Sequence, residues 1–319
     1  MPAAKATLEI EIRPAWPYRL PRGSGGDGVA YVRGGVVIRL VRCEGEFLAV
    51  AAWQRRSGEV RMRATPAAVA VDPAMRDEAQ PRGSRTALER ALERVRFALA
   101  VDDDLSTFHT AFRRDPLLGP AISARPWHRP RRRPLAWEAL AWAVTKQLID
   151  SPRAAAIQRR MVRRWGEAAA SPFASGVVLR DVPSAAAIAD RAPAELAAVD
   201  LSAGRALALI AAAREVAAGR VDPADAAGDA RLRRIHGIGP WTLQCLGLHG
   251  RGEPDSLPAG DLAYLKVVGR LASLGRRATV EEVEDFFAAY EPFRGLAGSF
   301  VVAHYHRLVG HGPPLRRAA

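Results

Sequence analysis

The stretch RLRRIHGIGPWTLQCL, residues 231–246, decides the fold of the C-terminal half of this chain. Leu232 and Ile235 supply a short apolar face before the turn, and Ile238 continues it afterwards. Two glycines bracket Ile238, as expected where the backbone needs a positive φ or the close approach of another group. Pro240 has no amide hydrogen and therefore suits the first turn of a second helix. The stretch predicts a helix, a two-glycine hairpin and another helix.

A glycine turn at the start of a helix can bind an anion. Its backbone amides are exposed, and the helix dipole places partial positive charge there. Carbonyl groups on the other side of the turn can hold a monovalent cation, and a nucleic-acid phosphate needs no base readout to bind at such a place. An ordinary corner between two helices, with no ligand, is the alternative.

The composition is that of a folded protein with a basic surface. The 319 residues are 49% hydrophobic, and 47 Lys and Arg against 34 Asp and Glu give a net charge of +13. This balance favours a polyanionic partner, although the abundance of Ala and Arg together could equally reflect a GC-rich genome. Cys43 and Cys245 are the only cysteines. Two isolated cysteines exclude a disulfide scaffold, a cysteine zinc site and a four-cysteine iron–sulfur cluster.

The patterns along the chain predict an α+β fold. Period-two bursts within residues 6–72 indicate antiparallel strands, and apolar spacing over 86–100 indicates a helix packed on them. We expect a small N-terminal α+β domain at 1–115, an exposed basic Pro- and Arg-rich connection at 116–133, and an all-α helix-hairpin-helix region at 134–319. The N-terminus lacks an apolar signal region and no apolar run reaches membrane-spanning length, so we expect a cytoplasmic protein without a membrane partner.

The helix predicted within residues 134–150 ends at Gln147 and Leu148. Ser151 is a plausible cap for the next helix, with Pro152 in its first turn. A side chain at this exposed helix end could insert into a binding partner.

Two motifs together resemble a known family. LRRIHGIGPWT (232–242), followed by an aspartate in LPAGDLAYLK (257–266), is similar to the helix-hairpin-helix and aspartate of the HhH-GPD superfamily of DNA glycosylases. Within it, the chain most resembles 3-methyladenine DNA glycosylase II over about residues 134–310. The resemblance implies an active site in a cleft between domains, and an enzyme that flips a damaged base out of double-stranded DNA and hydrolyses its N-glycosidic bond.

The resemblance implies that Asp261 is the catalytic residue. A fixed carboxylate there would stabilise the oxocarbenium character of the departing sugar or orient the attacking water. The position also suits a helix N-cap, which is the alternative role. Asp255 in the same loop is the weaker candidate.

Trp241 stands where glycosylases with lyase activity carry a Schiff-base lysine. The resemblance therefore implies a monofunctional enzyme in which Trp241 stacks on a cationic base. Core packing is the alternative for this tryptophan.

The remaining residues come from the same comparison. Leu148 matches the wedge that fills the gap left by a flipped nucleotide, with a buried core leucine as the alternative. Gln147, directly before Leu148, is also expected to contact DNA. Lys146 stands at the position of the family's usual glycine and could add a phosphate contact. DNA phosphate would meet the amides of Gly237, Gly239 and Trp241. A sodium or potassium ion would meet the carbonyls of Arg233, Ile235 and Ile238.

The pocket departs from the family pattern. An expected aromatic position is Cys245, and Phe300 or Tyr305 could replace a late aromatic residue that falls near Val302. Trp16 and Tyr18 match the pocket rim only loosely.

Three functions are consistent with these residues. The first is a monomeric glycosylase for alkylated purines in base-excision repair, with no required cofactor. The second is a glycosylase for deaminated or mispaired bases. The third is a DNA-structure-binding protein that has lost catalysis.

Overall fold

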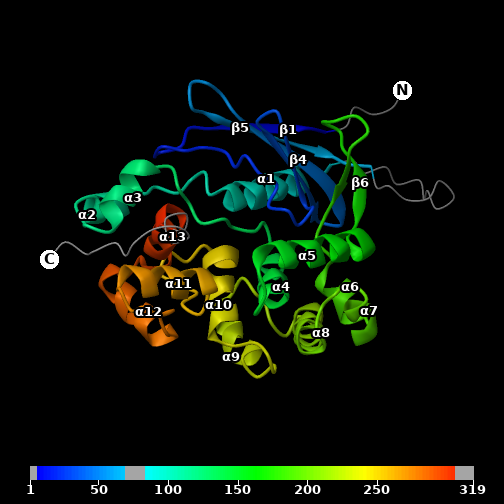
Figure 1. Ribbon diagram of the computed structural model, residues 1–319. Coiled ribbons are helices and arrows are strands. Elements are labelled where there is room, and N and C mark those ends of the chain that lie inside the picture. The colour runs from blue at the N-terminus through cyan, green and yellow to red at the C-terminus, as the bar shows by residue number, and fades with distance from the viewer. Residues whose placement is uncertain (1–5, 69–82, 306–319) are drawn as a thin grey trace, which may run out of the picture.

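A computed structural model describes residues 6–68 and 83–305 (Figure 1). Its N-terminal part is a five-stranded antiparallel sheet in the order β1-β5-β4-β3-β2. The strands are β1 Leu8–Ile12, β2 Ala30–Arg33, β3 Val36–Cys43, β4 Glu46–Gln54 and β5 Val60–Pro66. Four of them confirm the period-two segments, whereas β2 spans only four residues and is too short to show a pattern.

Helix α1 (Arg85–Leu99) covers one face of this sheet. Ser84 caps it by accepting a hydrogen bond from the amide of Ala87. Its buried Leu88, Leu92 and Val95 pack against strand residues in one core. The predicted helix over 86–100 is therefore confirmed.

The other face of the sheet packs against a hairpin that the sequence did not predict. Strands β6 (Ala168–Ala170) and β7 (Val178–Arg180) pair with each other. Their Ala169 and Leu179 pack against a cluster that includes Leu40. The expectation of an all-α region from residue 134 onward is wrong here, because three-residue strands are too short to show a period-two pattern.

Helices make up most of the remaining chain. They are α2 Ser106–Phe112, α3 Leu118–Ala124, α4 Ala136–Lys146, α5 Ser151–Trp165, α6 Ala185–Ala189, α7 Pro193–Ala197, α8 Ala203–Ala217, α9 Asp229–Leu232, α10 Pro240–Leu246, α11 Leu262–Leu271, α12 Val280–Phe287 and α13 Arg294–Tyr305, with short turns η2 Ala226–Gly228, η3 Gly247–Arg251 and η4 Ala288–Tyr290. Among the described residues, none of these helices has the length and apolar character needed to cross a bilayer.

The basic segment between the sheet and the helices is more ordered than an exposed connection. Leu118 and Ile122 of α3 are buried against the C-terminal helices, in one core with Phe108 of α2. Seven arginines and four prolines between 113 and 133 concealed this short apolar turn in the sequence. The expected exposure is thus wrong for α3.

The helices form two apolar cores. One joins α4, α5, α6, α8 and the glycine hairpin. The other joins α2, α3, α11, α12 and α13. Lys146 ends α4 on the first core, and Asp261 precedes α11 on the second. Residues from both cores can therefore meet at one site.

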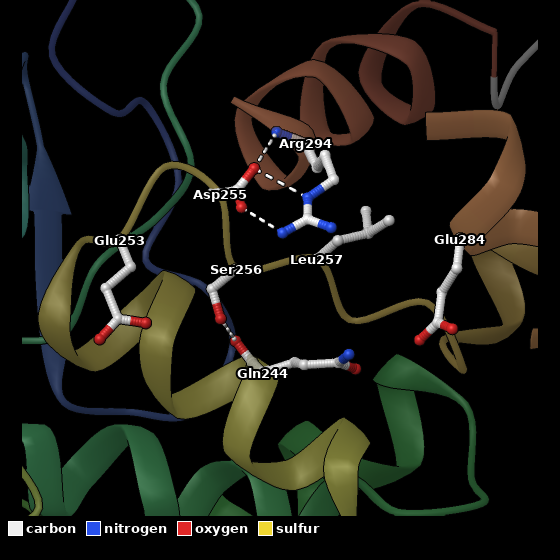
Figure 2. A pocket seen from close by; sticks show the side chains of 7 residues that line it. All are labelled: Gln244, Glu253, Asp255, Ser256, Leu257, Glu284 and Arg294. Atoms are coloured by element: carbon white, nitrogen blue, oxygen red, sulfur yellow. Dashed lines mark hydrogen bonds and ion pairs between the residues drawn. The ribbon is translucent and has the colours of Figure 1, made fainter. Parts of the chain in front are cut away.

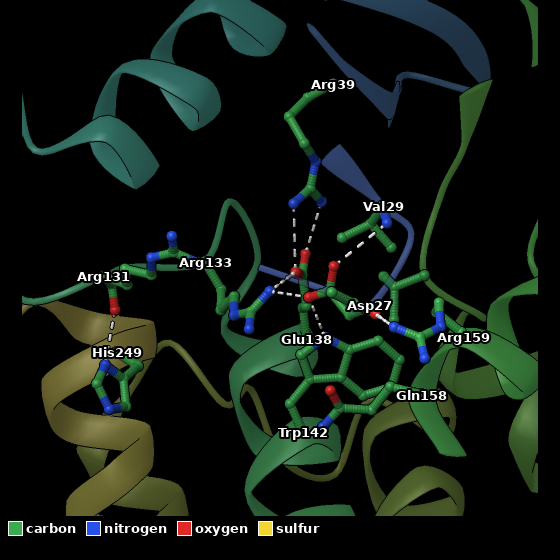
Figure 3. A network of polar contacts seen from close by, with 12 residues as sticks. Asp27, Val29, Arg39, Arg131, Arg133, Glu138, Trp142, Gln158, Arg159 and His249 are labelled. Atoms are coloured by element: carbon green, nitrogen blue, oxygen red, sulfur yellow. Dashed lines mark hydrogen bonds and ion pairs between the residues drawn. The ribbon is translucent and has the colours of Figure 1, made fainter. Parts of the chain in front are cut away.

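A buried ion network fastens α4 to the sheet (Figure 3). Arg39 of β3 donates two hydrogen bonds to the carboxylate of Glu138, whose side chain is fully buried. Arg133 pairs with both Glu138 and Asp27. Trp142 donates its indole hydrogen to the same Asp27. These contacts fix the orientation of α4, and hence of the residues at its end.

Candidate active site

The glycine hairpin connects α9 to α10. Gly237 has a φ of +88°, a left-handed conformation that side chains disfavour. A Cβ on Gly237 would lie 3.2 Å from that of Ala208. Gly239 has a φ of −106° and open space around its Cβ direction. The expected need for glycine is therefore met at Gly237, whereas at Gly239 no contact or positive φ requires it.

The start of α10 has unused backbone donors. Within the described residues, the amides of Gly237, Gly239 and Trp241 donate no hydrogen bond. Ile235 already accepts from the amide of Ile238 at 3.0 Å. The turn thus offers free donors on one side, while the cation at the carbonyls of Arg233, Ile235 and Ile238 stays a prediction.

Gln147 ties the end of α4 to this hairpin. Its Nε2 donates to the carbonyl of Gly237 at 2.6 Å and to Oγ1 of Thr242 at 2.9 Å. Thr242 itself is buried in α10. The amide side chain therefore holds both sides of the glycine turn against the α4–α5 connection.

Leu148 projects from that connection into solvent. Its relative exposure is 105%, and its φ is +57°. The alternative of a buried core leucine is therefore wrong. The cap of α5 is Asp150, which accepts from the amide of Arg153, so the expectation of a cap at Ser151 is wrong by one residue. The local fold holds an apolar side chain outward at a cost in backbone strain.

Asp261 uses its two carboxylate oxygens differently. Oδ1 caps α11 by accepting from the amide of Ala263 at 2.9 Å. Oδ2 lies 3.7 Å from Nζ of Lys146, and the side chain is 22% exposed. The capping alternative therefore accounts for one oxygen and leaves the other directed at the end of α4.

Trp241 and Cys245 of α10 are two predicted pocket residues that lie near the Asp261 carboxylate. The Trp241 ring lies against the loop before Asp261, since a Cβ on Gly260 would be 3.5 Å from Cδ1 of Trp241. Nε1 of Trp241 is buried and has no hydrogen-bond partner within the described residues. Burial raises the pKa of Cys245 to about 12, so its thiol is neutral and a poor nucleophile.

Phe300 and Tyr305 were expected to line the pocket, but their described contacts lie elsewhere. Phe300 is buried against the rings of Phe108, His109 and His128. Tyr305 donates its hydroxyl hydrogen to the carbonyl of Leu117 at 3.0 Å. Among the described residues, no hydrogen bond or ring contact joins either side chain to Asp261 or Trp241. Their role as pocket residues stays a prediction.

Tyr18 and Trp16, which match the pocket rim only loosely, differ in exposure: Tyr18 is buried and Trp16 is partly buried. Tyr18 is buried and donates its hydroxyl hydrogen to the carbonyl of Leu99. Trp16 packs its ring against His109, 4.7 Å between centroids.

A cavity of about 600 Å³ lies on another side of α10 (Figure 2). Asp255 forms a bidentate ion pair with the Arg294 guanidinium there and also accepts a hydrogen bond from the Arg294 backbone amide. Both oxygens of Asp255 are therefore occupied. This pairing gives Arg294 a structural role and leaves Asp261 as the carboxylate with an oxygen outside helix capping.

Sequence reasoning missed the ion pair between Lys146 and Asp261 and the buried network around Glu138. The buried network did have a sequence signal, because charged residues stand within apolar patterns: Arg39 within VVIRLVR and Glu138 within AWEALAWAV. No comparable signal joins Lys146 to a residue 115 positions later, because only the tertiary fold brings the two together.

Two curated proteins are similar to this chain in sequence. No family model matches the chain. It is 26% identical over 207 residues to the DNA-3-methyladenine glycosylase of Bacillus subtilis (strain 168), covering 62% of this chain and 66% of that protein. It is 27% identical over 237 residues to a probable bifunctional transcriptional activator/DNA repair enzyme AlkA of Mycobacterium tuberculosis, covering 73% of this chain and 46% of the relative.

The fold comparison extends over nearly the whole chain. The 3-methyladenine DNA-glycosylase of Archaeoglobus fulgidus has a TM-score of 0.74 at 18% identity, and the match covers 95% of this chain and 100% of that one. The chain resembles 3-methyladenine DNA glycosylases in sequence and in fold. The predicted resemblance to this family is thereby confirmed.

A second solved structure also has a similar fold, and this chain matches only part of the length of its curated relatives. A structure of MBOgg1 in complex with a low-affinity DNA ligand matches with a TM-score of 0.71 at 17% identity, over 95% of this chain and 96% of the other. This chain spans less than two thirds of the length of the curated relatives it matches. Similarity at these identities establishes the fold, and the chemistry has to be argued from the site.

Proposed function

We propose that this protein is a monofunctional DNA glycosylase that hydrolyses the N-glycosidic bond of alkylated purines, of the 3-methyladenine type, in base-excision repair. The observation that carries the proposal is the Asp261 carboxylate, which keeps Oδ2 outside helix capping beside the glycine hairpin of α10. The names of the relatives support the substrate class.

We propose that the protein is a monomer and that it binds double-stranded DNA. The unused amides at Gly237, Gly239 and Trp241 suit one phosphate of the backbone. Leu148 is exposed at the position from which a wedge would enter the base stack. The net charge of +13 favours the same polyanion. The damaged nucleotide would enter the cleft between the domains, and DNA as substrate implies a location inside the cell.

Asp261 acts on the sugar. As the base departs, positive charge develops over C1′ and the ring oxygen of the deoxyribose, and an ionised carboxylate nearby lowers the energy of that transition state. The Oδ1 hydrogen bond to the α11 backbone holds the carboxyl group in one orientation. An alkylated purine is already cationic and leaves without a strong general acid, so one carboxylate suffices.

Trp241 recognises the base. An indole face attracts a cationic ring, which favours an alkylated purine over its neutral parent. Trp241 has no amine, so base release at this position is hydrolytic and leaves an abasic site. The reaction needs no cofactor, although a sodium or potassium ion at the hairpin carbonyls would support phosphate binding.

A panel of modified duplexes tests the proposal. The protein is incubated with duplexes that carry 3-methyladenine, 7-methylguanine, hypoxanthine or mispaired uracil, and each released base is identified by mass spectrometry. We expect release of the alkylated purines. Release of hypoxanthine or uracil alone would assign the protein to deaminated bases. DNA binding without release of any base would leave a structure-binding protein.

A further inference from the structure

His249 lies on the same helix face as two predicted pocket residues. Helix α10 continues into η3, a wider π-helical turn of a kind that is frequent at functional sites. Trp241, Cys245 and His249 follow one another at intervals of four residues, so their side chains share one face. Sequence reasoning assigned the first two to the base pocket and gave His249 no role.

The His249 ring is close to the charges of the candidate active site. Lys146 and Asp261 both act electrostatically on it, as they do on the Cys245 thiol. Cys245 is buried, whereas His249 is partly exposed. A partly exposed polar ring near Asp261 can therefore contact a nucleotide that binds there.

The segment before α4 fixes the orientation of this ring (Figure 3). Nδ1 of His249 bonds to the carbonyl of Arg131 at 2.6 Å, and the backbone carbonyl of His249 accepts from the amide of Arg133 at 2.8 Å. Because a carbonyl group only accepts hydrogen bonds, Nδ1 carries the hydrogen. Nε2 lies on the opposite side of the ring and has no hydrogen-bond partner within the described residues. One ring nitrogen is thus fixed, and the other is left for a ligand.

Nε2 of His249 is a hydrogen-bond acceptor. Burial lowers the pKa of His249 to about 4, and the positive charges of Arg133 and Lys146 also lower it. The imidazole is therefore neutral at pH 7, with its hydrogen on Nδ1 and a lone pair on Nε2. A neutral ring does not repel a cationic base, whereas a protonated ring would.

The three side chains suit a purine that is held from three sides. Asp261 would lie at the sugar and Trp241 would stack on the base. His249 is eight residues beyond Trp241, roughly 12 Å along the helix axis, and could reach the edge of the base away from the glycosidic bond. Enzymes that flip a base out of the duplex read its Watson–Crick edge by hydrogen bonds, and the group at position 6 belongs to that edge.

An acceptor at this edge distinguishes adenine from guanine. Adenine carries an amino donor at position 6, whereas guanine carries a carbonyl oxygen, whose lone pairs would repel the lone pair of Nε2. Alkylation adds positive charge to the ring and makes the amino group a stronger donor. We propose that Nε2 of His249 accepts a hydrogen bond from the 6-amino group of the flipped base, so that the protein favours alkylated adenine over alkylated guanine. This inference rests on the proposed glycosylase function and narrows its substrate class.

Competition between two methylated bases tests the inference. Double-stranded DNA treated with a methylating agent carries 3-methyladenine and 3-methylguanine, which share the N3 methyl group and the positive charge but differ in their exocyclic groups. Each released base is quantified by mass spectrometry and normalised to its spontaneous loss from the same DNA. We expect the unaltered protein to release 3-methyladenine at least about tenfold faster, because guanine loses the hydrogen bond and leaves two acceptors facing each other.

Variants of His249 separate recognition from packing. His249→Phe keeps a planar ring without an acceptor, and the ratio of the two release rates should fall at least about fivefold. His249→Gln supplies a carbonyl oxygen as an acceptor and should keep more of the preference. His304→Phe, the same substitution on α13, is the matched control and should leave the ratio unchanged. Both bases compete in one reaction, so the ratio does not depend on how much of a variant is folded.

Three results would overturn the inference. They are equal release of the two bases by the unaltered protein, an unchanged ratio in His249→Phe, and an equal fall in His249→Phe and His249→Gln. The last result would mean that the ring acts by packing and not as an acceptor.

Calorimetric binding of the free bases separates the inference from the proposed function. Free 3-methyladenine and 3-methylguanine are titrated into the unaltered protein and into His249→Phe, which requires no bond cleavage. We expect tighter binding of 3-methyladenine to the unaltered protein and loss of that difference in His249→Phe; no difference in the unaltered protein overturns the inference. If neither base is released from DNA, the proposed function fails and calorimetry still decides the role of His249. Equal release of both bases would keep the glycosylase proposal and remove His249 as the specificity residue.

Discussion

Replacement of Leu148 by glycine should leave stability nearly unchanged and impair base release. Leu148 is fully exposed, so its side chain contributes no burial to the folded state. Its φ of +57° costs roughly 1–2 kcal/mol for a residue with a Cβ, which glycine would recover. The greater freedom of glycine in the unfolded chain offsets about 0.5–1 kcal/mol of that gain. The unfolding free energy should therefore rise by about 0–1.5 kcal/mol.

The catalytic effect follows from the same exposure. A leucine that moves from water into the gap left by a flipped nucleotide gains about 1.5–3 kcal/mol. Since about 1.4 kcal/mol is a factor of ten in rate, Leu148→Gly should release base roughly 10 to 100 times more slowly.

Urea unfolding and single-turnover base release measure the two effects. Leu140→Ala, in the buried core of α4, should by contrast lose about 2–5 kcal/mol of stability. Val178→Ala removes an exposed apolar side chain from β7 and should change neither quantity. A loss of more than about 2 kcal/mol on Leu148→Gly, or release at the unaltered rate, would refute this account of the wedge.

Three further predictions concern the contacts that position the site. Glu138→Gln removes the carboxylate that accepts two hydrogen bonds from the buried Arg39, and leaves Asp181, at 4.0 Å, as its remaining ion-pair partner among the described residues. Urea unfolding should show a loss of about 3–5 kcal/mol; a loss below about 1 kcal/mol would contradict a buried ion pair. Burial raises the pKa of Asp181 to about 7, so the folded state keeps a proton that the unfolded chain releases above about pH 4, and stability should fall as pH rises from 4 to 7. Asp181→Asn should flatten that fall, and an unchanged pH profile would show that Asp181 does not cause it. Gln147→Ala removes two hydrogen bonds to the hairpin and should lower stability by about 1–2 kcal/mol and weaken duplex binding in fluorescence anisotropy; unchanged binding would argue against coupling of the α4 end to the hairpin.

The sequence predicted the elements that depend on local patterns. The hairpin at Gly237, the cap at Asp261 and the helix end at Gln147 all follow from rules that act over a few residues. At Gly239 the φ is negative, so the expected close approach of another group is the remaining reason for a glycine there, and it stays a prediction.

Long-range contacts could not be predicted from these patterns. Lys146 and Asp261 are 115 positions apart and meet only because two separately packed cores bring α4 and α11 together. The pairing of Arg39 with Glu138 has the same origin. Phe300 has the apolar character of a pocket residue and of a core residue alike, and its ring contacts with Phe108 and His128 come from the fold.

The most direct test of the central claim is base release by Asp261→Asn. The asparagine can still accept the hydrogen bond that caps α11, so the fold should remain, but it carries no negative charge to stabilise the sugar cation. Duplex containing 3-methyladenine is incubated with each protein, and the free base is quantified by mass spectrometry. We expect release by the unaltered protein and a loss of at least a hundredfold in Asp261→Asn, with duplex binding retained. Release of 3-methyladenine at the same rate by both proteins would contradict the assignment of Asp261 as the catalytic residue.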